Sequence, residues 1–340
     1  MRKLDVFNHI MPRPFYDLMM KVAPEHRDMG KRVRAIPMLF DLDERFRVMD
    51  LFEDYHQVLS LASPPIEVFG PPDIVGELAC AANDGMAELV DRHPDRFPAF
   101  VAALPMNDVP AALDEARRAV EKLGARGLQL YSNVLGRPLD SPEFLPLFDL
   151  MAGYDLPILL HPARGARFAD YPVENSSKYE IWWAFGWPYE TSVAMARIVF
   201  AGLFDRHPNL KVITHHLGAM VPYFEGRVGP GWDQIGSRTS GEDLARVAQR
   251  LKRRPLDYFH MFYGDTAVFG SHAATECGLS FFGADRVLFA SDAPFDPEKG
   301  PMYIRETIRV LDAIAISTED REKIYFRNAE KLLKVGKRPW

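Results

Sequence analysis

Four short apolar runs of the sequence each end at a histidine or an aspartate. The residues at these ends are His9, His161, the pair His215 and His216, and Asp292. If the runs are parallel strands of one barrel, their carboxyl ends meet at the same rim. Neutral imidazole nitrogens and carboxylate oxygens suit a borderline divalent ion, and three protein ligands with open positions are typical of a catalytic site. The sequence therefore predicts a catalytic metal site, with zinc as the expected ion and manganese as the second choice.

Each of these histidines could instead have a structural role. A single histidine at a strand end is more often structural than a ligand, but four converging ends favour function. His215 and His216 are adjacent, and because side chains alternate along a strand we expect only one of them to face the barrel mouth. No functional role is expected for the six remaining histidines, which are His26, His56, His93, His207, His260 and His272.

The elements that would position these residues alternate between strand-like and helix-like segments, as in repeated βα units. Eight apolar runs predict strands at Leu4–Asn8, Gln57–Leu61, Ala99–Leu104, Gly127–Leu130, Pro157–Leu160, Lys211–Thr214, Tyr258–Tyr263 and Arg286–Ala290. Amphipathic stretches predict helices that include Asp73–Arg92, Val109–Lys122, Pro142–Ala152, Thr191–Phe204 and Met302–Ala315. Eight strands of this kind predict an α/β fold, a (β/α)8 TIM barrel.

Two segments are too long for ordinary loops. They are Ile10–His56 and Arg164–Glu190, and they follow predicted strands 1 and 5. Loops after strands form the active-site face of a barrel, so both segments are expected to act as lids or substrate walls. With no repeat or linker in between, residues 1–340 are expected to form one domain.

Composition narrows the class of partner. The chain has 340 residues, 47% of them hydrophobic and 26% charged, and a formal net charge of -6. Nucleic acid and anionic membranes favour dense basic patches, so neither is expected as a partner. Its two cysteines, Cys80 and Cys277, lack metal-ligand spacing, and no apolar stretch resembles a signal peptide or a membrane span. We therefore expect a cytoplasmic protein.

Ordered motifs along nearly the whole chain carry a family resemblance. They are Met49-Asp50, Val58-Leu59-Ser60, Leu160-His161-Pro162, Trp187-Pro188-Tyr189-Glu190-Thr191, Thr214-His215-His216-Leu217-Gly218, Pro222 with Arg227, Tyr263-Gly264-Asp265-Thr266-Ala267, Asp285-Arg286-Val287-Leu288 and Ser291-Asp292-Ala293-Pro294-Phe295. The chain resembles the decarboxylase branch of the amidohydrolase superfamily, typified by aminocarboxymuconate-semialdehyde decarboxylase and γ-resorcylate decarboxylase. The resemblance implies a metal-dependent decarboxylase that acts on a small aromatic or unsaturated carboxylic acid.

The resemblance also assigns roles. The family's first strand usually ends in Asp-x-His-x-His, but here a phenylalanine, Phe7, replaces the first histidine. The implied metal ligands are His9, His161 and Asp292. His216 aligns with the family's catalytic histidine, and Asp292 is the second implied catalytic residue, since either side chain could move a proton. His215 is an extra residue that could compensate for the lost ligand.

Substrate contacts are expected from two places. Arg45 or Arg47 could pair with a substrate carboxylate through a bidentate fork. Trp183 and Trp187 belong to an aromatic segment that could wall in a planar substrate. The resemblance further implies a homodimer or larger homo-oligomer.

Two other functions stay open. The same ligands would serve a metal-dependent hydrolase or hydratase of a lactone, amide or unsaturated acid. A barrel that lost its metal together with the first histidine would instead be a binding or regulatory protein.

Overall fold

The computed structural model describes residues 1–25, 28–240 and 243–336, and within these ranges eight strands run parallel in two sheets. One sheet has the order β1-β2-β3, and the other has the order β10-β9-β8-β7-β4. The strands are β1 (Lys3–Ile10), β2 (Tyr55–Leu61), β3 (Ala99–Phe100), β4 (Leu128–Tyr131), β7 (Ile158–His161), β8 (Val212–Thr214), β9 (Tyr263–Asp265) and β10 (Val287–Leu288). A small antiparallel hairpin, β5 (Asn133–Val134) with β6 (Arg137–Pro138), follows β4.

Backbone contacts link the two sheets at both ends. An isolated parallel bridge joins Ala102, just past β3, to Leu128 of β4. On the other side, the Val6 N–H of β1 donates to Phe289 O at 3.0 Å, just past β10. Together the sheets therefore bring β1 beside the segment that leads to Asp292.

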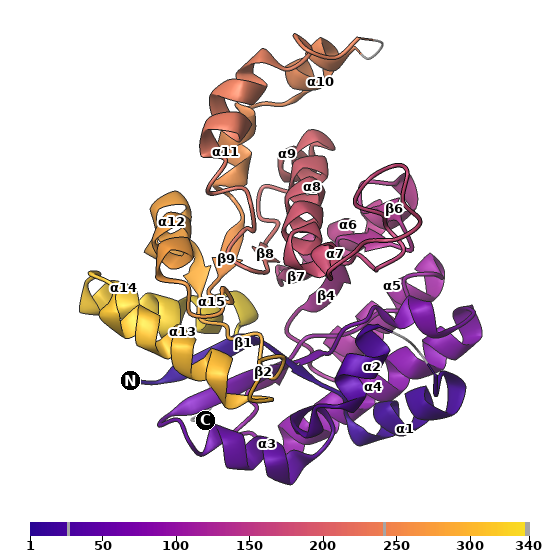
Figure 1. Cartoon of the computed structure of the whole chain (residues 1–340). Helices are drawn as coiled ribbons and strands as arrows, with labels where there is room; N and C mark the ends of the chain where they lie inside the picture. Colours follow the sequence, from indigo (N-terminus) through magenta and orange to yellow (C-terminus); the bar gives the residue numbers. More distant parts are fainter. Residues whose placement is uncertain (26–27, 241–242, 337–340) are drawn as a thin grey trace.

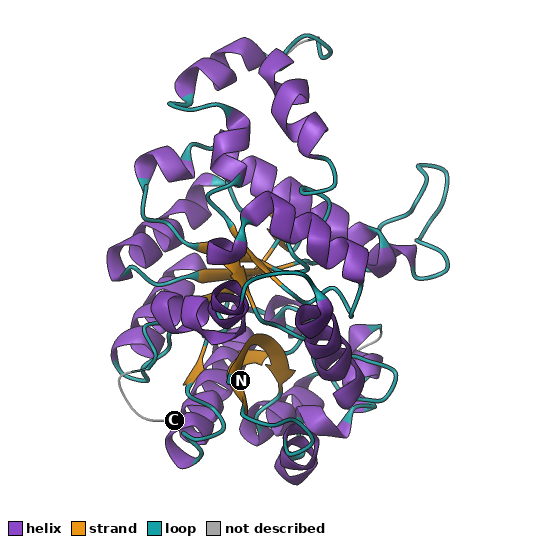
Figure 2. Ribbon diagram, turned by 90° about the vertical axis from the view of Figure 1, so that its left-hand side faces the viewer, coloured by secondary structure: helices purple, strands orange, loops and turns teal. Residues whose placement is uncertain are grey.

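Helices surround the strands, which lie in the middle of the molecule (Figure 2). They are α1 (Arg13–Val22), α2 (Met29–Arg34), α3 (Leu42–Met49), α4 (Pro72–Arg92), α5 (Val109–Glu121), α6 (Leu145–Tyr154), α7 (Ile181–Ala184), α8 (Gly186–Phe200), α9 (Leu203–Arg206), α10 (Leu244–Arg250), α11 (Pro255–Phe259), α12 (His272–Phe282), α13 (Pro301–Ala313), α14 (Thr318–Glu322) and α15 (Asn328–Leu333). Figure 1 shows α10 and α11 projecting away from the rest of the chain. Among the described residues, none of the helices is long and apolar enough to cross a bilayer.

Local sequence explains several helix starts. The Asp108 carboxylate accepts the Ala111 N–H at the start of α5, and a proline occupies the first turn. The Ser271 hydroxyl accepts the Ala274 N–H at the start of α12. These caps satisfy N–H groups that have no partner within the helix.

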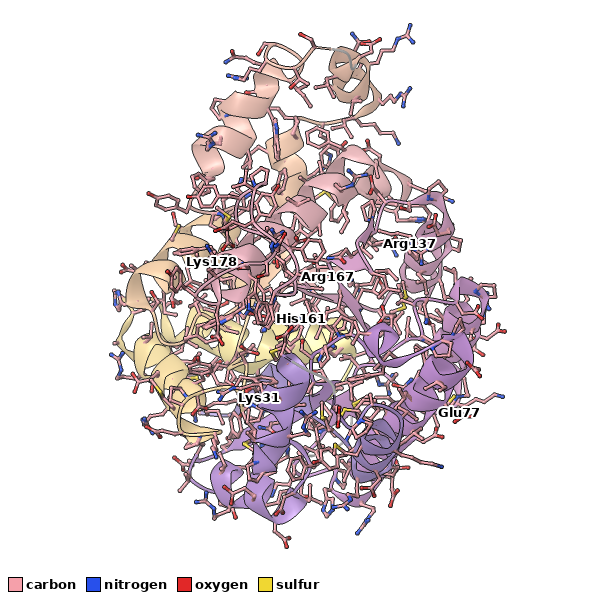
Figure 3. The ribbon with its side chains drawn as sticks, turned by 45° about the vertical axis from the view of Figure 1, so that its right-hand side comes forward. Lys31, Glu77, Arg137, His161, Arg167 and Lys178 are labelled. Atoms are coloured by element: carbon pink, nitrogen blue, oxygen red, sulfur yellow. The ribbon has the colours of Figure 1, made fainter. Side chains whose placement is uncertain are left out.

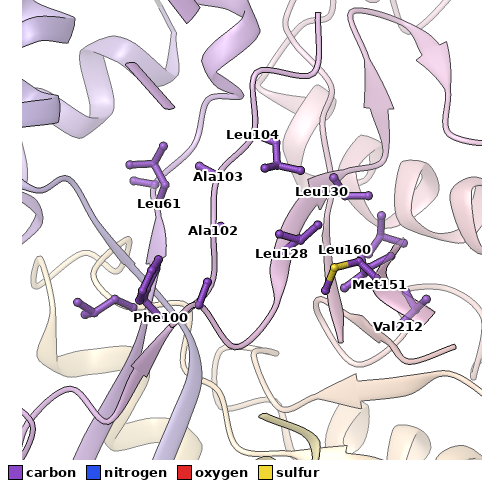
Figure 4. Packing of buried hydrophobic residues seen from close by; sticks show 14 of the residues in the cluster. Leu61, Phe100, Ala102, Ala103, Leu104, Leu128, Leu130, Met151, Leu160 and Val212 are labelled. Atoms are coloured by element: carbon purple, nitrogen blue, oxygen red, sulfur yellow. The ribbon is translucent and has the colours of Figure 1, made fainter. Parts of the chain in front are cut away.

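The buried apolar residues form two clusters. The smaller cluster includes Leu4, Val6, Phe7 and Val58. Figure 4 shows part of the larger one, with Leu128, Leu130 and Leu160 among the labelled side chains. The pairing of β1 with β2 shifts register between Asp5 and Asn8, which marks a bulge that re-aims the residues leading to His9.

The α/β class is confirmed, whereas one strand prediction was wrong in its bounds. The run Tyr258–Tyr263 begins with the last two residues of α11, which starts at Pro255, continues through a turn, and reaches the strand only at Tyr263. The two segments expected to be long loops contain helices: α1, α2 and α3 lie in the first and α7 in the second. His26 lies outside the described residues.

Candidate metal and active site

Four buried side chains bring their ligand atoms together at the carboxyl ends of the strands. They are His9, His161, His215 and Asp292, and one ligand atom from each lies within 4.8 Å of all the others. Nε2 of His9 is 3.0 Å from Asp292 Oδ1, and Nε2 of His215 is 3.3 Å from the same oxygen. His161 lies near the centre of the molecule in the view of Figure 3, with Arg167 above it and Lys31 below. Three imidazoles and one carboxylate in a buried cluster fit a divalent metal ion.

The far nitrogen of each imidazole is held by a protein acceptor. His161 Nδ1 is 2.7 Å from Pro162 O, and His215 Nδ1 is 2.6 Å from Asp265 Oδ2. His9 Nδ1 lies 3.4 Å from Ser60 Oγ, whose own hydrogen goes to Asn8 O. A ring that donates through Nδ1–H leaves its Nε2 lone pair available to an ion, the usual arrangement behind metal-binding histidines.

Both His215 and His216 face this region, so the prediction that only one of them does so was wrong. The strand β8 ends at Thr214, and His216 and Leu217 have φ values of +57° and +55°. Side-chain alternation holds only while the backbone stays extended, and here the chain has turned. The two rings stack with centroids 3.8 Å apart.

Burial and the charges of neighbouring side chains shift the pKa values of the cluster residues in different directions. Burial, with the neighbouring His215 and His9, holds the pKa of His161 well below its ordinary value. Burial opposes charge on His215 too, but the carboxylates of Asp265 and Asp292 outweigh it and raise the pKa of His215 to about 9. Although burial favours a neutral acid at Asp292, hydrogen bonds from His215 and His9 lower its pKa. The cluster therefore stabilises a positive charge beside Asp292, the place that a metal ion would take.

His216 stays outside the ligand cluster but next to it. Its Nδ1 is 2.7 Å from Ala267 O, and its backbone N–H donates to Asp265 Oδ1 at 3.1 Å. Burial and the adjacent His215 lower the pKa of His216 to about 4, so the ring is neutral at pH 7. A neutral, half-buried imidazole with a free Nε2 can accept a proton from a substrate.

Phe7 occupies the position where the family pattern has a ligand. Its ring stacks on His215 with centroids 3.9 Å apart and also contacts His9 and His161. The phenylalanine therefore packs against three candidate ligands and offers no donor of its own, while the cluster gains its fourth donor from His215.

Comparison with known proteins places this arrangement in a family. A family model described as amidohydrolase matches residues 8–335. The chain belongs to the amidohydrolase family. The resemblance to its decarboxylase branch is confirmed by similar proteins: a γ-resorcylate decarboxylase of Polaromonas sp. is 33% identical over 305 residues, covering 87% of this chain and 88% of the relative.

Solved structures agree with the sequence relatives. A dihydroxybenzoic acid decarboxylase from Polaromonas sp., with bound manganese and the inhibitor 2-nitroresorcinol, has a TM-score of 0.76 and 27% identity, covering 98% of this chain and 97% of that one. A 5-carboxyvanillate decarboxylase from Sphingomonas paucimobilis has a TM-score of 0.80 and 25% identity, covering 98% and 99%. This amidohydrolase therefore shares its fold with enzymes over nearly its whole length.

The two tryptophans predicted to contact substrate differ in position. The Trp187 ring meets His161 edge-on at 5.6 Å, and its indole N–H donates to Arg164 O at 3.1 Å. Trp183 is 38% exposed and donates instead to the Glu180 carboxylate. Trp187 therefore borders the site of this amidohydrolase, whereas the indole of Trp183 is bonded to the residue that precedes α7.

The structure corrects the expected role of Arg45 and Arg47. Arg45 is fully buried, and its guanidinium donates to the His9 carbonyl, to Gln57 Oε1 and to two further protein acceptors. Arg47 lies on the exposed side of α3 and is held in a fork by Glu44. Arg45 thus anchors the end of β1 from a fully buried position with four hydrogen bonds to protein acceptors, while Arg47 is engaged at the surface.

The sequence did not predict a role for Asp265, and it offered His215 only as a candidate to compensate for the lost ligand. The signal for Asp265 was present, because a carboxylate at a strand end belongs to the same pattern as Asp292. It was overlooked because the predicted strand ended at Tyr263, where β9 begins.

Proposed function

We propose that this amidohydrolase is a metal-dependent decarboxylase of a small aromatic or unsaturated carboxylic acid. The observation that carries the proposal is the buried convergence of His9, His161, His215 and Asp292, with the neutral His216 stacked beside it. Relatives named as aromatic-acid decarboxylases favour this reaction over hydrolysis or hydration.

The four convergent residues would hold a divalent ion, which would supply positive charge for binding and polarising a substrate oxygen. Zinc is the ion we propose from the three imidazoles and one carboxylate, and a manganese-bound relative supports manganese as the alternative. The ligand set proposed here is His9, His161 and Asp292 from the sequence, extended by His215.

Decarboxylation breaks a carbon–carbon bond and leaves its electron pair on the substrate carbon, which must then take up a proton. His216 lies beside the ligand cluster with Nε2 free, and Asp292 lies within it, so these two side chains are the groups proposed to move that proton. Trp187, packed on His161, would exclude water from one side of the reacting group.

The proposal also covers the closure of the barrel, the number of domains, the assembly and the location of the protein. The Ala102–Leu128 bridge and the Val6–Phe289 hydrogen bond support a (β/α)8 barrel closed through all eight strands, with long segments after its first and fifth strands. Residues 1–340 would form one such domain. A homodimer or larger assembly is proposed from the family resemblance, and a cytoplasmic location from the two cysteines, which form no disulfide.

Metal content and carbon dioxide release test the proposal together. We expect near-stoichiometric metal in the wild type, loss of metal in His161→Ala and Asp292→Ala, and carbon dioxide release from an aromatic acid without uptake of solvent oxygen-18. Wild-type protein that binds no added metal would refute the metal-dependent mechanism. Oxygen-18 in the product would instead indicate hydrolysis.

A further inference from the structure

Phe7 lies among the candidate metal ligands and packs against the rings of three of them. The Phe7 side chain is fully buried and comes from β1. Its ring centroid lies 3.9 Å from that of His215, 5.6 Å from that of His9 and 5.8 Å from that of His161. The centroids of the three imidazoles lie between 5.1 Å and 6.1 Å from one another. Position 7 is therefore as close to the ligand rings as these rings are to each other.

The His215 ring is covered on both faces. Phe7 stacks on it with an interplanar angle of 21°, and His216 stacks on it with centroids 3.8 Å apart and an angle of 28°. Two rings stacked on the same face would touch, and among the described residues Phe7 and His216 make no ring contact with each other. The two rings therefore lie on opposite faces of the His215 imidazole.

These contacts restrict the one rotation that Asp265 leaves to the His215 ring. The hydrogen bond between His215 Nδ1 and Asp265 acts in the plane of the ring and directs Nε2 toward Asp292 Oδ1. Rotation about the Cβ–Cγ bond would turn the ring out of this plane and carry Nε2 away. A flat ring packed on each face opposes this rotation. Ligands of a functional site are held in place by such packing as well as by hydrogen bonds.

We propose that Phe7 is a positioning residue that holds His215 in place as the fourth metal donor, and that positions 7 and 215 are alternative places for this donor. The inference rests on the proposed function, because it assumes that the cluster holds a divalent ion. With phenylalanine at position 7, the fourth donor comes from the residue that follows β8, and the Phe7 ring keeps it aligned. A histidine at position 7 would bring an imidazole into the same cluster from β1.

Zinc affinity, measured by competition with a chelator, tests the positioning role. Phe7→Leu removes the stacked ring but keeps an apolar side chain. Phe148→Leu, in α6, is the matched control for the loss of a fully buried phenylalanine. Both variants should lower the thermal stability of the metal-free protein, but only Phe7→Leu should also raise the zinc dissociation constant, by about threefold to tenfold, the scale of a stacking contact. Equal zinc affinity in the two variants would overturn the positioning role.

An exchange of donors tests the second part of the inference. His215→Ala removes the fourth donor and should raise the zinc dissociation constant by more than the about 10–100-fold that is typical of losing a supporting partner. Adding Phe7→His to His215→Ala should recover most of that loss, because the new imidazole can reach the same cluster. Thermal unfolding of the metal-free variants shows whether they are folded. A folded double variant that binds zinc as weakly as His215→Ala would overturn the exchange.

The same measurements separate this inference from the proposed reaction. Wild-type protein without zinc affinity would refute the metal-dependent mechanism and the role of Phe7 together. The expected order of zinc affinities, without carbon dioxide release from any acid, would count against the proposed reaction alone.

Discussion

The Nδ1 atom of His215 lies 2.6 Å from Oδ2 of Asp265, and both side chains are fully buried. This contact sets the direction in which the His215 ring presents Nε2 to Asp292. It links the ends of two neighbouring strands, β8 and β9, and supplies the candidate site with the donor that Phe7 does not provide.

Replacing Asp265 should weaken metal binding without dismantling its surroundings. In Asp265→Asn the amide oxygen can still accept the His216 and Ala267 N–H groups, but the negative charge behind His215 is lost. Loss of such a supporting partner typically costs about 10–100-fold in metal affinity. Competition with a chelator measures this change, and Asp257→Asn, on the exposed side of α11, is the control. Equal affinity in Asp265→Asn and wild type would contradict this role.

We expect His215 to be needed for metal binding and His216 for the reaction. His215→Asn removes a donor from the cluster and should lower the metal content of the purified protein. His216→Asn should keep its metal but release carbon dioxide about 10²–10⁴-fold more slowly, the usual effect of losing a general acid or base. Elemental analysis and single-turnover assays on both variants give the comparison. The assignment would fail if His216→Asn lost metal and His215→Asn kept it.

A buried carboxyl away from the cluster should make stability depend on pH. Glu67 is 5% exposed and lines a small cavity with Gln129 and Tyr131, and burial raises the pKa of Glu67 to about 7. Between pH 4.5, the ordinary pKa of this carboxyl, and pH 7, Glu67 therefore keeps its proton in the folded chain and loses it in the unfolded chain. As pH rises between these two pKa values, the free energy of unfolding should fall by on the order of 3 kcal/mol because of this group, and it should then level off.

Glu67→Gln removes that titration, so the free energy of unfolding should depend less on pH in this variant than in the wild type. Urea unfolding at pH 5 and pH 8 is the measurement, and Glu77→Gln, exposed on α4, is the control. Asp5, whose pKa burial also raises to about 7, contributes a slope of the same sign in every variant, so the difference between curves isolates Glu67. Parallel curves for wild type and Glu67→Gln would show that the carboxyl is not neutral in the folded protein.

Two helical glycines should respond in opposite ways to alanine. A Cβ at Gly278 in α12 would lie 2.2 Å from Leu217 Cδ2, whereas a Cβ at Gly76 in α4 meets nothing within 4 Å. Gly278→Ala should destabilise by about 1–3 kcal/mol and lower activity, because Leu217 follows His216 in the same turn. Gly76→Ala should stabilise by about 0.5–1 kcal/mol through helix propensity. Thermal unfolding distinguishes them, and a Gly278→Ala protein as stable and active as wild type would refute the tight contact.

Much of the fold was predictable from the sequence alone. Strand-forming runs and amphipathic helices are local patterns, so each of the eight predicted strands meets an observed one. Five match closely, β3 and β10 are each only two residues long, and the last is reached only at Tyr263. Parallel strands bring their carboxyl ends to one edge, and for that reason the sequence predicts that His9, His161 and Asp292 lie together. The ordered motifs likewise led to the family.

Contacts beyond the ends of the strands were decided only by the tertiary structure. Both His215 and His216 face the site because the chain leaves the extended conformation after Thr214, which no alternation pattern reveals. The Arg45 guanidinium donates to the His9 carbonyl, 36 residues away, and the Arg32 guanidinium donates to the Phe295 carbonyl, 263 residues away. Local sequence determines which segments become strands, but the partner of a long polar side chain depends on where distant backbone acceptors come to lie in the folded chain.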